Sequence, residues 1–491
     1  MCGIIGTLPV NRVVIERGLR ELYERGPDDQ ATALTDFAGV GISRLAITDL
    51  DGGAQPLSSR SGSTIVVFNG AIYNHQRLRQ KFPGAFRSQN DGEVIHALYE
   101  SEGLSFARHL EGMFAIIILD LKRRRMVMAC DSLGIKPLYW VRSEETWVVA
   151  SSIKAIPSEL AGMVKRFPPG EVWATDGERS AFEPLIEPRA TLIEEIRAAV
   201  QSHLPREVSW GCMLSGGIDS ALVTALAAEG AAKPVLAYTV GHSASPDVVY
   251  AGKLAEEFGL RHRIVEVEPD GLMAAVERVV ECTATFDPGI IVNGVGTYLV
   301  AQAARRDGLK VLLSGEGADE LFGGYEEHLS IPPAGLTRSL IEWQKDLGAS
   351  ECLRLDRCTM ACGIEARVPY LAPGVVGFAR SLPPEQKILH LPDRVVGKYS
   401  LREAAQSVLP SWMVNREKIP FYKGSEIGAA LKSLAASRFR LEELDEMRQT
   451  HPEFPFVNLL AVWFFHLWRS KYPRLAESWQ EMVERGLARR F

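Results

Sequence analysis

The chain has 491 residues, of which 46% are hydrophobic and 24% are charged, and its formal net charge is −6. These values are typical of a soluble globular protein and suggest two to four domains. The sequence contains no run of eighteen apolar residues and no long basic block. Both observations argue against a membrane span and against nucleic acid as the main partner.

The seven cysteines include no Cys-x-x-Cys pair, and no signal peptide precedes the first of them. Such a pattern predicts free thiols in a reducing compartment, so we expect a cytoplasmic protein. Cys358 and Cys362 lie four residues apart, but no further cysteine or histidine cluster supplies the other ligands of a zinc site. Zinc is therefore not expected.

Residues 1–160 are typical of strands and turns with two helical patches. Short apolar strands are expected at 65–68, 114–119 and 126–130, and a helix at 92–101. A polar, proline-bearing stretch predicts a linker near 178–190.

Beyond this linker the pattern changes. Expected strands lie at 208–214, 235–240, 263–267 and 310–313, and expected helices at 190–203, 220–229 and 247–258. Strands that alternate with helices predict a parallel, doubly wound sheet. From about Ala334 onward helical patterns dominate.

Cys2 directly follows the initiator methionine. Removal of Met1 would place the Cys2 thiol beside its own α-amine, whose pKa is about 7.7–8.0, so the amine is partly neutral near pH 7 to 8. An N-terminal nucleophile therefore carries its own general base. The alternative is an ordinary cysteine near a flexible end, and Cys2 alone does not separate the two interpretations.

A glycine turn lies between the strand at 208–214 and the helix that follows it, with the sequence Ser215-Gly216-Gly217-Ile218-Asp219-Ser220. The glycines allow backbone N–H groups to face an anion, and the serine hydroxyls and the helix N-terminus add further donors. The turn matches neither the GxxxxGK[ST] nor the GxGxxG pattern. We expect a phosphate site, with Asp219 as a ligand of Mg²⁺ rather than of phosphate.

A second acidic cluster, at 314–325, follows the strand at 310–313. Ligands of an open parallel sheet gather at the carboxyl ends of the strands, and both clusters occupy such ends. A solvated acidic turn is the alternative interpretation.

Cys2 and these two clusters together resemble the glutamine-dependent asparagine synthetases of the class B type, from Met1 to about Arg469. The first half is similar to a class II glutamine amidotransferase domain. Its matching motifs are at residues 1–4, 25–28, 44–45, 53–57, 68–70, 72–74, 91–93, 112–115 and 134–139. The second half adds motifs at 214–220, 314–325, 363–370, 398–402 and 416–418.

The resemblance implies two domains. Residues 1–185 would form a glutaminase with the αββα sandwich of the N-terminal nucleophile enzymes. Residues 186–491 would form an ATP-pyrophosphatase domain, with a doubly wound parallel sheet and a helical C-terminal part.

In the first domain, the resemblance implies that Cys2 attacks the glutamine carboxamide and releases ammonia. Asn69 and the Gly70 N–H would form the oxyanion hole. Arg44 would pair with the glutamine α-carboxylate and Asp91 would hold the α-amine. Taken singly, Arg44 could equally be a surface cation, and Asp91 could cap the helix that begins beside it.

In the second domain, a carboxylate would attack the ATP α-phosphorus, and ammonia would then attack the acyl-adenylate. The resemblance implies that Asp219 and Asp319 hold Mg²⁺ and that Glu316 receives a proton from the attacking ammonia. Lys418 would stabilise charge at the α-phosphate, although alone it could be a solvated side chain. The implied ATP and pyrophosphate site comprises Leu214, Ser215, Gly216, Gly217, Asp219, Ser220, Val240, Ser314, Gly315, Glu316 and Lys418.

Several positions depart from the family pattern. Ala71 replaces a glutamate that, by resemblance, helps to bind the glutamine α-amine, so we expect weak glutamine binding and good use of free ammonia. The segment 286–294 lacks an arginine often found there. Other departures are Ile42, Cys130, Ser152 and Ala372.

The expected partners are therefore small molecules: glutamine, ATP and a carboxylate acceptor, with L-aspartate as the first choice. The departures keep open an amidotransferase paralogue that acts on another carboxylate in specialised metabolism. A likeness to β-lactam synthetases, which lack the glutaminase cysteine, is disfavoured by Cys2. A non-catalytic binding protein is disfavoured by the retained acidic residues and Lys418. A homodimer is left open.

Overall fold

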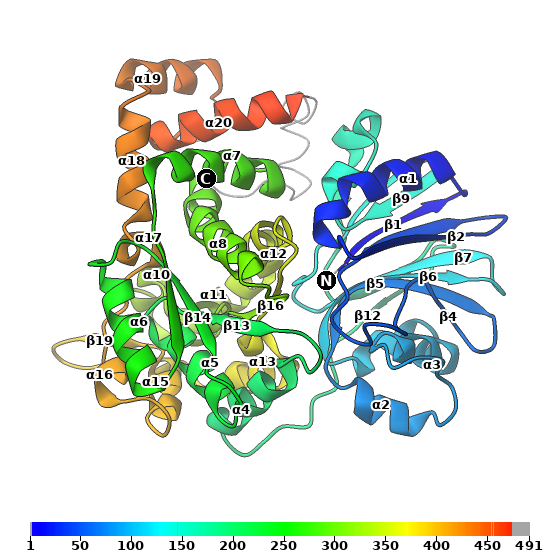
Figure 1. Cartoon of the computed structure of the whole chain (residues 1–491), viewed down its shortest axis with the longest axis horizontal. Coiled ribbons are helices and arrows are strands. Elements are labelled where there is room, and N and C mark those ends of the chain that lie inside the picture. The colour runs from blue at the N-terminus through cyan, green and yellow to red at the C-terminus, as the bar shows by residue number, and fades with distance from the viewer. Residues whose placement is uncertain (1, 145, 453, 455, 474–491) are drawn as a thin grey trace.

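The computed structural model describes residues 2–144, 146–452, 454 and 456–473. Figure 1 shows two bodies side by side, with the blue and cyan N-terminal part on the right and the green to red remainder on the left. The predicted boundary at residue 185 lies in the segment 182–190, which contains no helix or strand.

The N-terminal body contains two antiparallel sheets, each of six strands among the described residues. In spatial order, the first sheet consists of β10 (Lys165–Arg166), β8 (Tyr139–Ser143), β9 (Thr146–Ala150), β1 (Gly3–Leu8), β3 (Gly39–Arg44) and β2 (Asp29–Leu34). The second consists of β12 (Arg179–Ala181), β11 (Glu171–Ala174), β7 (Arg125–Cys130), β6 (Gly112–Asp120), β5 (Thr64–Ile72) and β4 (Leu57–Ser58).

Helices cover the outer faces of the two sheets, which confirms the predicted αββα sandwich (Figure 1). Helix α1 (Arg12–Glu21) packs on β1 and β3, while α2 (His75–Lys81) and α3 (Glu93–Glu102) lie beside the second sheet. Short 3₁₀ turns are η1 (Tyr23–Arg25), η2 (Gly103–His109), η3 (Ile153–Ala155) and η4 (Ser158–Met163). Between the sheets, Cys2 packs in one buried cluster with Ile4, Val67 and Ile117.

Most predicted elements are shifted by one or two residues, as for the strand expected at 263–267, which is β15 (Arg261–Val265). Two differences bear on the site and on the domain boundary. The strand expected to end at Phe68 continues to Ile72, because β6 pairs with it through Gly70 and beyond. Asn69 therefore lies within a strand and not in a turn. The predicted linker also begins too early, since residues Arg179–Ala181 pair with β11 as strand β12.

The second body is built on a parallel sheet, which confirms the predicted doubly wound arrangement. Its spatial order is β15 (Arg261–Val265), β14 (Leu236–Val240), β13 (Trp210–Met213), β16 (Val311–Leu313) and β17 (Glu365–Arg367). The order places β13 and β16 next to each other. The loops that follow these two strands are those with the glycine turn and the acidic cluster.

Helices cover both faces of this sheet and extend into a helical C-terminal part (Figure 1). The helix α4 (Leu192–His203) begins at a capping box in which Thr191 and Glu194 bond each other's backbone N–H groups. The remaining helices are α5 (Ile218–Ala228), α6 (Pro246–Glu257), α7 (Pro269–Thr283), α8 (Pro288–Arg306), α9 (Ala318–Phe322), α10 (Glu326–Leu329), α11 (Pro333–Asp346), η5 (Leu347–Ala349), α12 (Glu351–Met360), η6 (Pro369–Leu371), α13 (Pro373–Ser381), α14 (Pro384–Lys387), α15 (Tyr399–Ala405), α16 (Ser411–Val414), α17 (Phe421–Gly424), α18 (Ile427–Ala436), α19 (Leu441–Thr450) and α20 (Leu459–Lys471). A hairpin of β18 (Ile388–His390) and β19 (Val395–Gly397) stands apart from the main sheet.

One apolar cluster joins the two bodies. It contains Met113 and Ile135 from the N-terminal body and Leu214, Ala366 and Val368 from the second. A continuous buried core across the boundary holds the two bodies in a defined relation, because apolar burial favours a single packed arrangement. None of the helices in the described part of the chain is long and apolar enough to span a membrane.

Candidate functional site

Cys2 lies directly before β1 and is buried. Its backbone N–H donates a hydrogen bond of 3.0 Å to Asn69 Oδ1, and its carbonyl accepts one of 3.3 Å from Arg25 Nε. Burial raises the pKa of the Cys2 thiol, so the thiol is protonated at neutral pH and needs a base before it can attack. The α-amine of Cys2 would serve as this base once Met1 is removed. Met1 itself lies outside the described residues.

Asn69 carries the clearest sign of a ligand site. Its side chain is fully buried, and Nδ2 has no hydrogen-bond partner among the described residues. Buried polar groups are nearly always paired, so an unpaired amide donor beside a thiol suits an oxygen of a substrate. At the neighbouring Gly70 a Cβ would collide with the Met113 carbonyl, so a glycine is needed for β5 to pair this closely with β6.

Arg44 is buried at the end of β3, so the interpretation as a surface cation is wrong. Its guanidinium donates to the carbonyls of Asp49 at 2.7 Å and Leu50 at 3.3 Å. These bonds hold the loop after β3 and leave Arg44 without a carboxylate partner among the described ion pairs.

Asp91 is also buried, and it does not cap the following helix, whose N-cap is Gly92. Instead its Oδ2 accepts the backbone N–H of Ile72 at 2.8 Å, which ties it to the end of β5. Burial raises the pKa of Asp91 to about 6, so the carboxylate is charged at neutral pH and can pair with an ammonium group.

The glycine turn connects β13 to α5, as predicted. Ser215 and Ser220 face each other with 3.1 Å between their hydroxyl oxygens, and Gly216 has a φ of +72° that favours glycine. A Cβ at Gly217 would meet only Ser215 Oγ, at 3.6 Å, so the inside of the turn is open. An open glycine turn at a helix N-terminus is suited to an anion.

The other predicted ATP-site residues surround this turn. The N–H of Leu214 donates to the Tyr238 carbonyl at 2.8 Å, and Val240 ends the adjacent strand β14. The loop with Ser314 and Gly315 packs against the start of α5, where a Cβ on Gly315 would lie 2.7 Å from the Ser220 nitrogen. All three segments therefore meet at the carboxyl edge of the sheet.

Asp219 and Asp319 are brought together by Lys398, a residue to which the sequence had assigned no role. Lys398 Nζ lies 2.6 Å from Asp319 Oδ1 and also bonds Asp219 Oδ2, while Lys418 pairs with the same Asp319 oxygen. Burial opposes ionisation of Asp319, but Lys398 and Lys418 outweigh it and lower its pKa to about 2. Lys418 is exposed, as the solvated interpretation expects, but its ammonium group is also paired with Asp319.

No cluster of three or more histidine, cysteine or acidic side chains suited to a metal occurs within the described residues. Mg²⁺ usually takes one or two carboxylates plus phosphate oxygens and water. Asp219 and Asp319 fit that requirement, because Asp219 Oδ1 is buried without a partner. The two aspartates could thus hold the ion together with a nucleotide.

Glu316 is held by Arg354 of α12, another residue that the sequence did not single out. Arg354 also binds Glu351 at 2.6 Å and donates to Thr297 Oγ1 at 2.6 Å. Burial raises the pKa of Glu316, against the opposing effect of Arg354. A carboxylate with a raised pKa is better suited to accept and release a proton.

Polar contacts also join the two bodies across the apolar boundary. Asp356 of α12 accepts hydrogen bonds from Arg25 at 2.8 and 3.2 Å and lies 3.5 Å from Lys136. Tyr73, directly after β5, stacks on His203 with 3.8 Å between ring centroids. These partners are far apart in the chain, so no local pattern could have predicted them.

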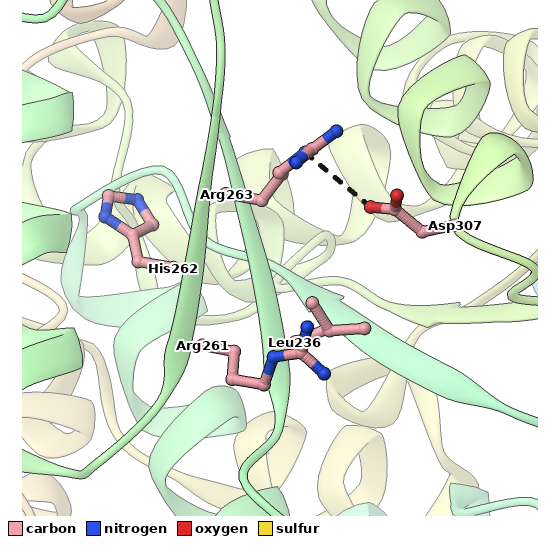
Figure 2. Close-up of a pocket in the computed structure, with 5 residues that line it drawn as sticks. All are labelled: Leu236, Arg261, His262, Arg263 and Asp307. Carbon is pink, nitrogen blue, oxygen red and sulfur yellow. Dashed lines mark ion pairs between the residues drawn. The ribbon is translucent and has the colours of Figure 1, made fainter.

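A cavity of about 270 Å³, drawn in Figure 2, is lined by none of these site residues. Leu236, Arg261, His262, Arg263 and Asp307 line it at the amino ends of β14 and β15. Arg263 Nε is 3.7 Å from Asp307, and β15 is an edge strand. Charged side chains commonly protect an edge strand from pairing with another chain. This role explains the arginines at the cavity, and no bound ligand is needed to explain them.

Two family descriptions match the chain. Residues 1–168 match "Glutamine amidotransferase domain", and residues 191–333 and 332–462 match "Asparagine synthase". The chain belongs to the glutamine-hydrolysing asparagine synthetase family. This membership confirms the predicted family and the class of both domains.

Curated relatives share about a third of the sequence over most of their length. Asparagine synthetase B of Escherichia coli K12 is 31% identical, covering 92% of this chain and 88% of that protein. The asparagine synthetase of Sandersonia aurantiaca is 32% identical, covering 86% and 87%, and a probable asparagine synthetase of Schizosaccharomyces pombe is 31% identical, covering 93% and 89%. A solved glutamine phosphoribosylpyrophosphate amidotransferase from B. subtilis is 19% identical over 54% of this chain and 66% of that one, with a TM-score of 0.33, too distant to bear on function.

Proposed function

We propose that this protein hydrolyses glutamine at Cys2 and passes the ammonia to an acyl-adenylate of L-aspartate, forming asparagine, AMP and pyrophosphate. The observation that carries the proposal is the meeting of two sites in one chain, joined by a buried apolar cluster. Family membership supports the same activity.

In the glutaminase step, the freed α-amine of Cys2 takes the thiol proton, and the thiolate attacks the glutamine carboxamide. The developing oxyanion accepts hydrogen bonds from Asn69 Nδ2, which has no other partner among the described residues, and from the Gly70 N–H. Arg44 and Asp91 orient the substrate by pairing with its α-carboxylate and α-amine. Ammonia leaves as the thioester forms, and water then releases glutamate.

Ammonia then crosses the domain boundary. We infer that it does so beside the apolar cluster that joins the two bodies and contains Met113, Ile135, Leu214 and Val368. Neutral ammonia can pass such a lining, whereas ammonium would pay a large desolvation cost. Such apolar surroundings would therefore favour neutral ammonia, the nucleophilic form.

In the synthetase step, the Gly216 and Gly217 turn and the hydroxyls of Ser215 and Ser220 hold the pyrophosphate part of ATP. Mg²⁺ bound by Asp219 and Asp319 would neutralise phosphate charge there. Lys418 stands beside Asp319 and stabilises negative charge at the α-phosphate while the acceptor carboxylate attacks. Ammonia next attacks the acyl carbon, and Glu316 takes its proton.

The acceptor is tested by a screen of carboxylates for ATP-dependent pyrophosphate release. We expect L-aspartate to give turnover above background, and exchange of labelled pyrophosphate into ATP with the same acceptor. Turnover with another carboxylate and none with L-aspartate would replace the acceptor while leaving the reaction class intact.

One observation supports a second candidate function, that of a paralogue acting on a different carboxylate. Arg354 is the buried cation beside Glu316, and it is already paired with Glu316 and Glu351. The segment 286–294 at the start of α8 adds no basic side chain. An acceptor with fewer negative charges than aspartate would need less cationic support.

Ala71→Glu should lower the KM for glutamine. Ala71 lies two residues after Asn69 on β5, so both side chains point to the same face of the sheet. A carboxylate there would add a charge-assisted hydrogen bond to the substrate α-amine, worth about ten- to a hundredfold in affinity. Steady-state glutaminase kinetics give the measurement, with Ala71→Gln as the uncharged control of similar size. An unchanged KM in Ala71→Glu would contradict the weak-glutamine hypothesis.

We further place the enzyme in the cytoplasm, with its thiols reduced. All seven cysteines are free, and five of them are buried. Free thiols in this number suit a reducing compartment.

A further inference from the structure

The pyrophosphate turn is held from outside by a buried ion pair that the catalytic scheme does not use. Arg416 Nη1 donates to the Gly216 carbonyl, and Arg416 Nη2 bonds Asp247 Oδ1 at 2.9 Å. Both side chains are almost fully buried. The guanidinium also stacks on Tyr250, with 4.1 Å from its carbon to the ring centroid.

This arrangement controls which way one peptide of the turn faces. The carbonyl and the N–H of a trans peptide point in opposite directions. A Gly216 carbonyl fixed on Arg416 therefore turns the N–H of Gly217 to the other side, where the turn is open. A Cβ on Gly216 would meet the Asp247 carbonyl oxygen at 2.7 Å and Arg416 Nη1 at 2.8 Å, so the contact is tight on both sides.

Asp247 in turn has little freedom. It lies in the first turn of α6, and a Cβ on Gly424 of α17 would collide with its carboxylate. Burial raises the pKa of Asp247 to about 6, with Arg416 opposing the rise. The carboxylate is thus charged at neutral pH and can fix the guanidinium.

We propose that Asp247 is a positioning residue for ATP: it holds Arg416 so that the guanidinium keeps the Gly216 carbonyl turned away from the pyrophosphate. We call the pair Asp247–Arg416 the clamp. It also steadies the segment that carries Lys418, two residues after Arg416. Arg402 of α15 supports that segment independently, because its Nη1 donates to the Arg416 carbonyl at 3.1 Å. The inference rests on the proposed function, since it concerns the turn proposed to hold pyrophosphate.

The test is Asp247→Asn, which keeps the shape of the side chain and removes its charge. We expect the Kd of MgATP, measured by calorimetry on the full-length protein, to rise about ten- to a hundredfold. Glutaminase kcat and the glutamine KM should stay at wild-type values, because Cys2 lies in the other domain. The matched control is Glu256→Gln, at an exposed position of the same helix, which should bind MgATP as the wild type does.

Asp247→Asn leaves a buried arginine without its carboxylate and can unfold the domain. The double variant Asp247→Asn/Arg416→Met removes both charges, and we expect it to recover the wild-type Tm while still binding MgATP weakly. Wild-type affinity for MgATP in either folded variant would overturn the clamp. If instead the wild-type protein binds MgATP but releases no pyrophosphate with any carboxylate, the proposed function fails and not the clamp.

Discussion

Cys2→Ala should abolish glutamine-dependent amide synthesis and leave ammonia-dependent synthesis at the wild-type rate. The variant lacks the nucleophile of the first step, and loss of a nucleophile commonly costs about 10⁴-fold or more in kcat. The synthetase residues are untouched, since they lie across the domain boundary. The measurement is asparagine formation with glutamine and, separately, with ammonium chloride as nitrogen source.

The matched control for this variant is Cys130→Ala. Cys130 is buried in the same cluster as Cys2 but lies on β7, where its thiol contacts the Lys136 carbonyl at 3.3 Å. It should retain both activities, because no step of the proposed reaction is assigned to it. Glutamine-dependent synthesis that survives in Cys2→Ala would show that another group performs the hydrolysis.

Glu316→Gln should reduce amide synthesis by about 10²- to 10⁴-fold, whichever nitrogen source is supplied. The amide cannot take the proton of the attacking ammonia. Adenylation precedes this step, so exchange of labelled pyrophosphate into ATP should persist. Glutaminase activity should persist as well.

Glu351→Gln separates the proton role of Glu316 from its contact with Arg354. Glu351 binds the same guanidinium, at 2.6 Å. Its replacement therefore tests whether loss of an ion pair with Arg354 is enough to reduce amide synthesis. We expect a much smaller decrease than in Glu316→Gln. Equal losses in the two variants, with lost pyrophosphate exchange in both, would assign Glu316 a structural part instead.

Much of this site could be predicted because its groups are local in the chain. The turn from Ser215 to Ser220 displays its glycines, hydroxyls and following helix within a few residues. The alternation of strands and helices likewise marks the parallel sheet. Asn69 could be singled out only by resemblance, and its position inside β5 was missed because the pairing with β6 extends past Phe68.

The contacts that could not be predicted join distant parts of the chain. Lys398 bonds Asp219 across 179 positions, and Arg25 bonds Asp356 across 331. Local periodicity records which face of an element is apolar, but it does not record which elements meet. A lysine between two aspartates becomes visible only when the strand ends converge.

By itself, the sequence determined the chemical groups available to this protein: a thiol at position 2, a glycine turn with two serine hydroxyls, and carboxylates after two strands. The tertiary structure decided how these groups are charged and held. Asp91 bonds β5 instead of capping α3, and Lys398 and Lys418 hold Asp319 ionised. The physical reason is that hydrogen bonding and charge depend on burial and on neighbours in space, which the folded chain alone brings together.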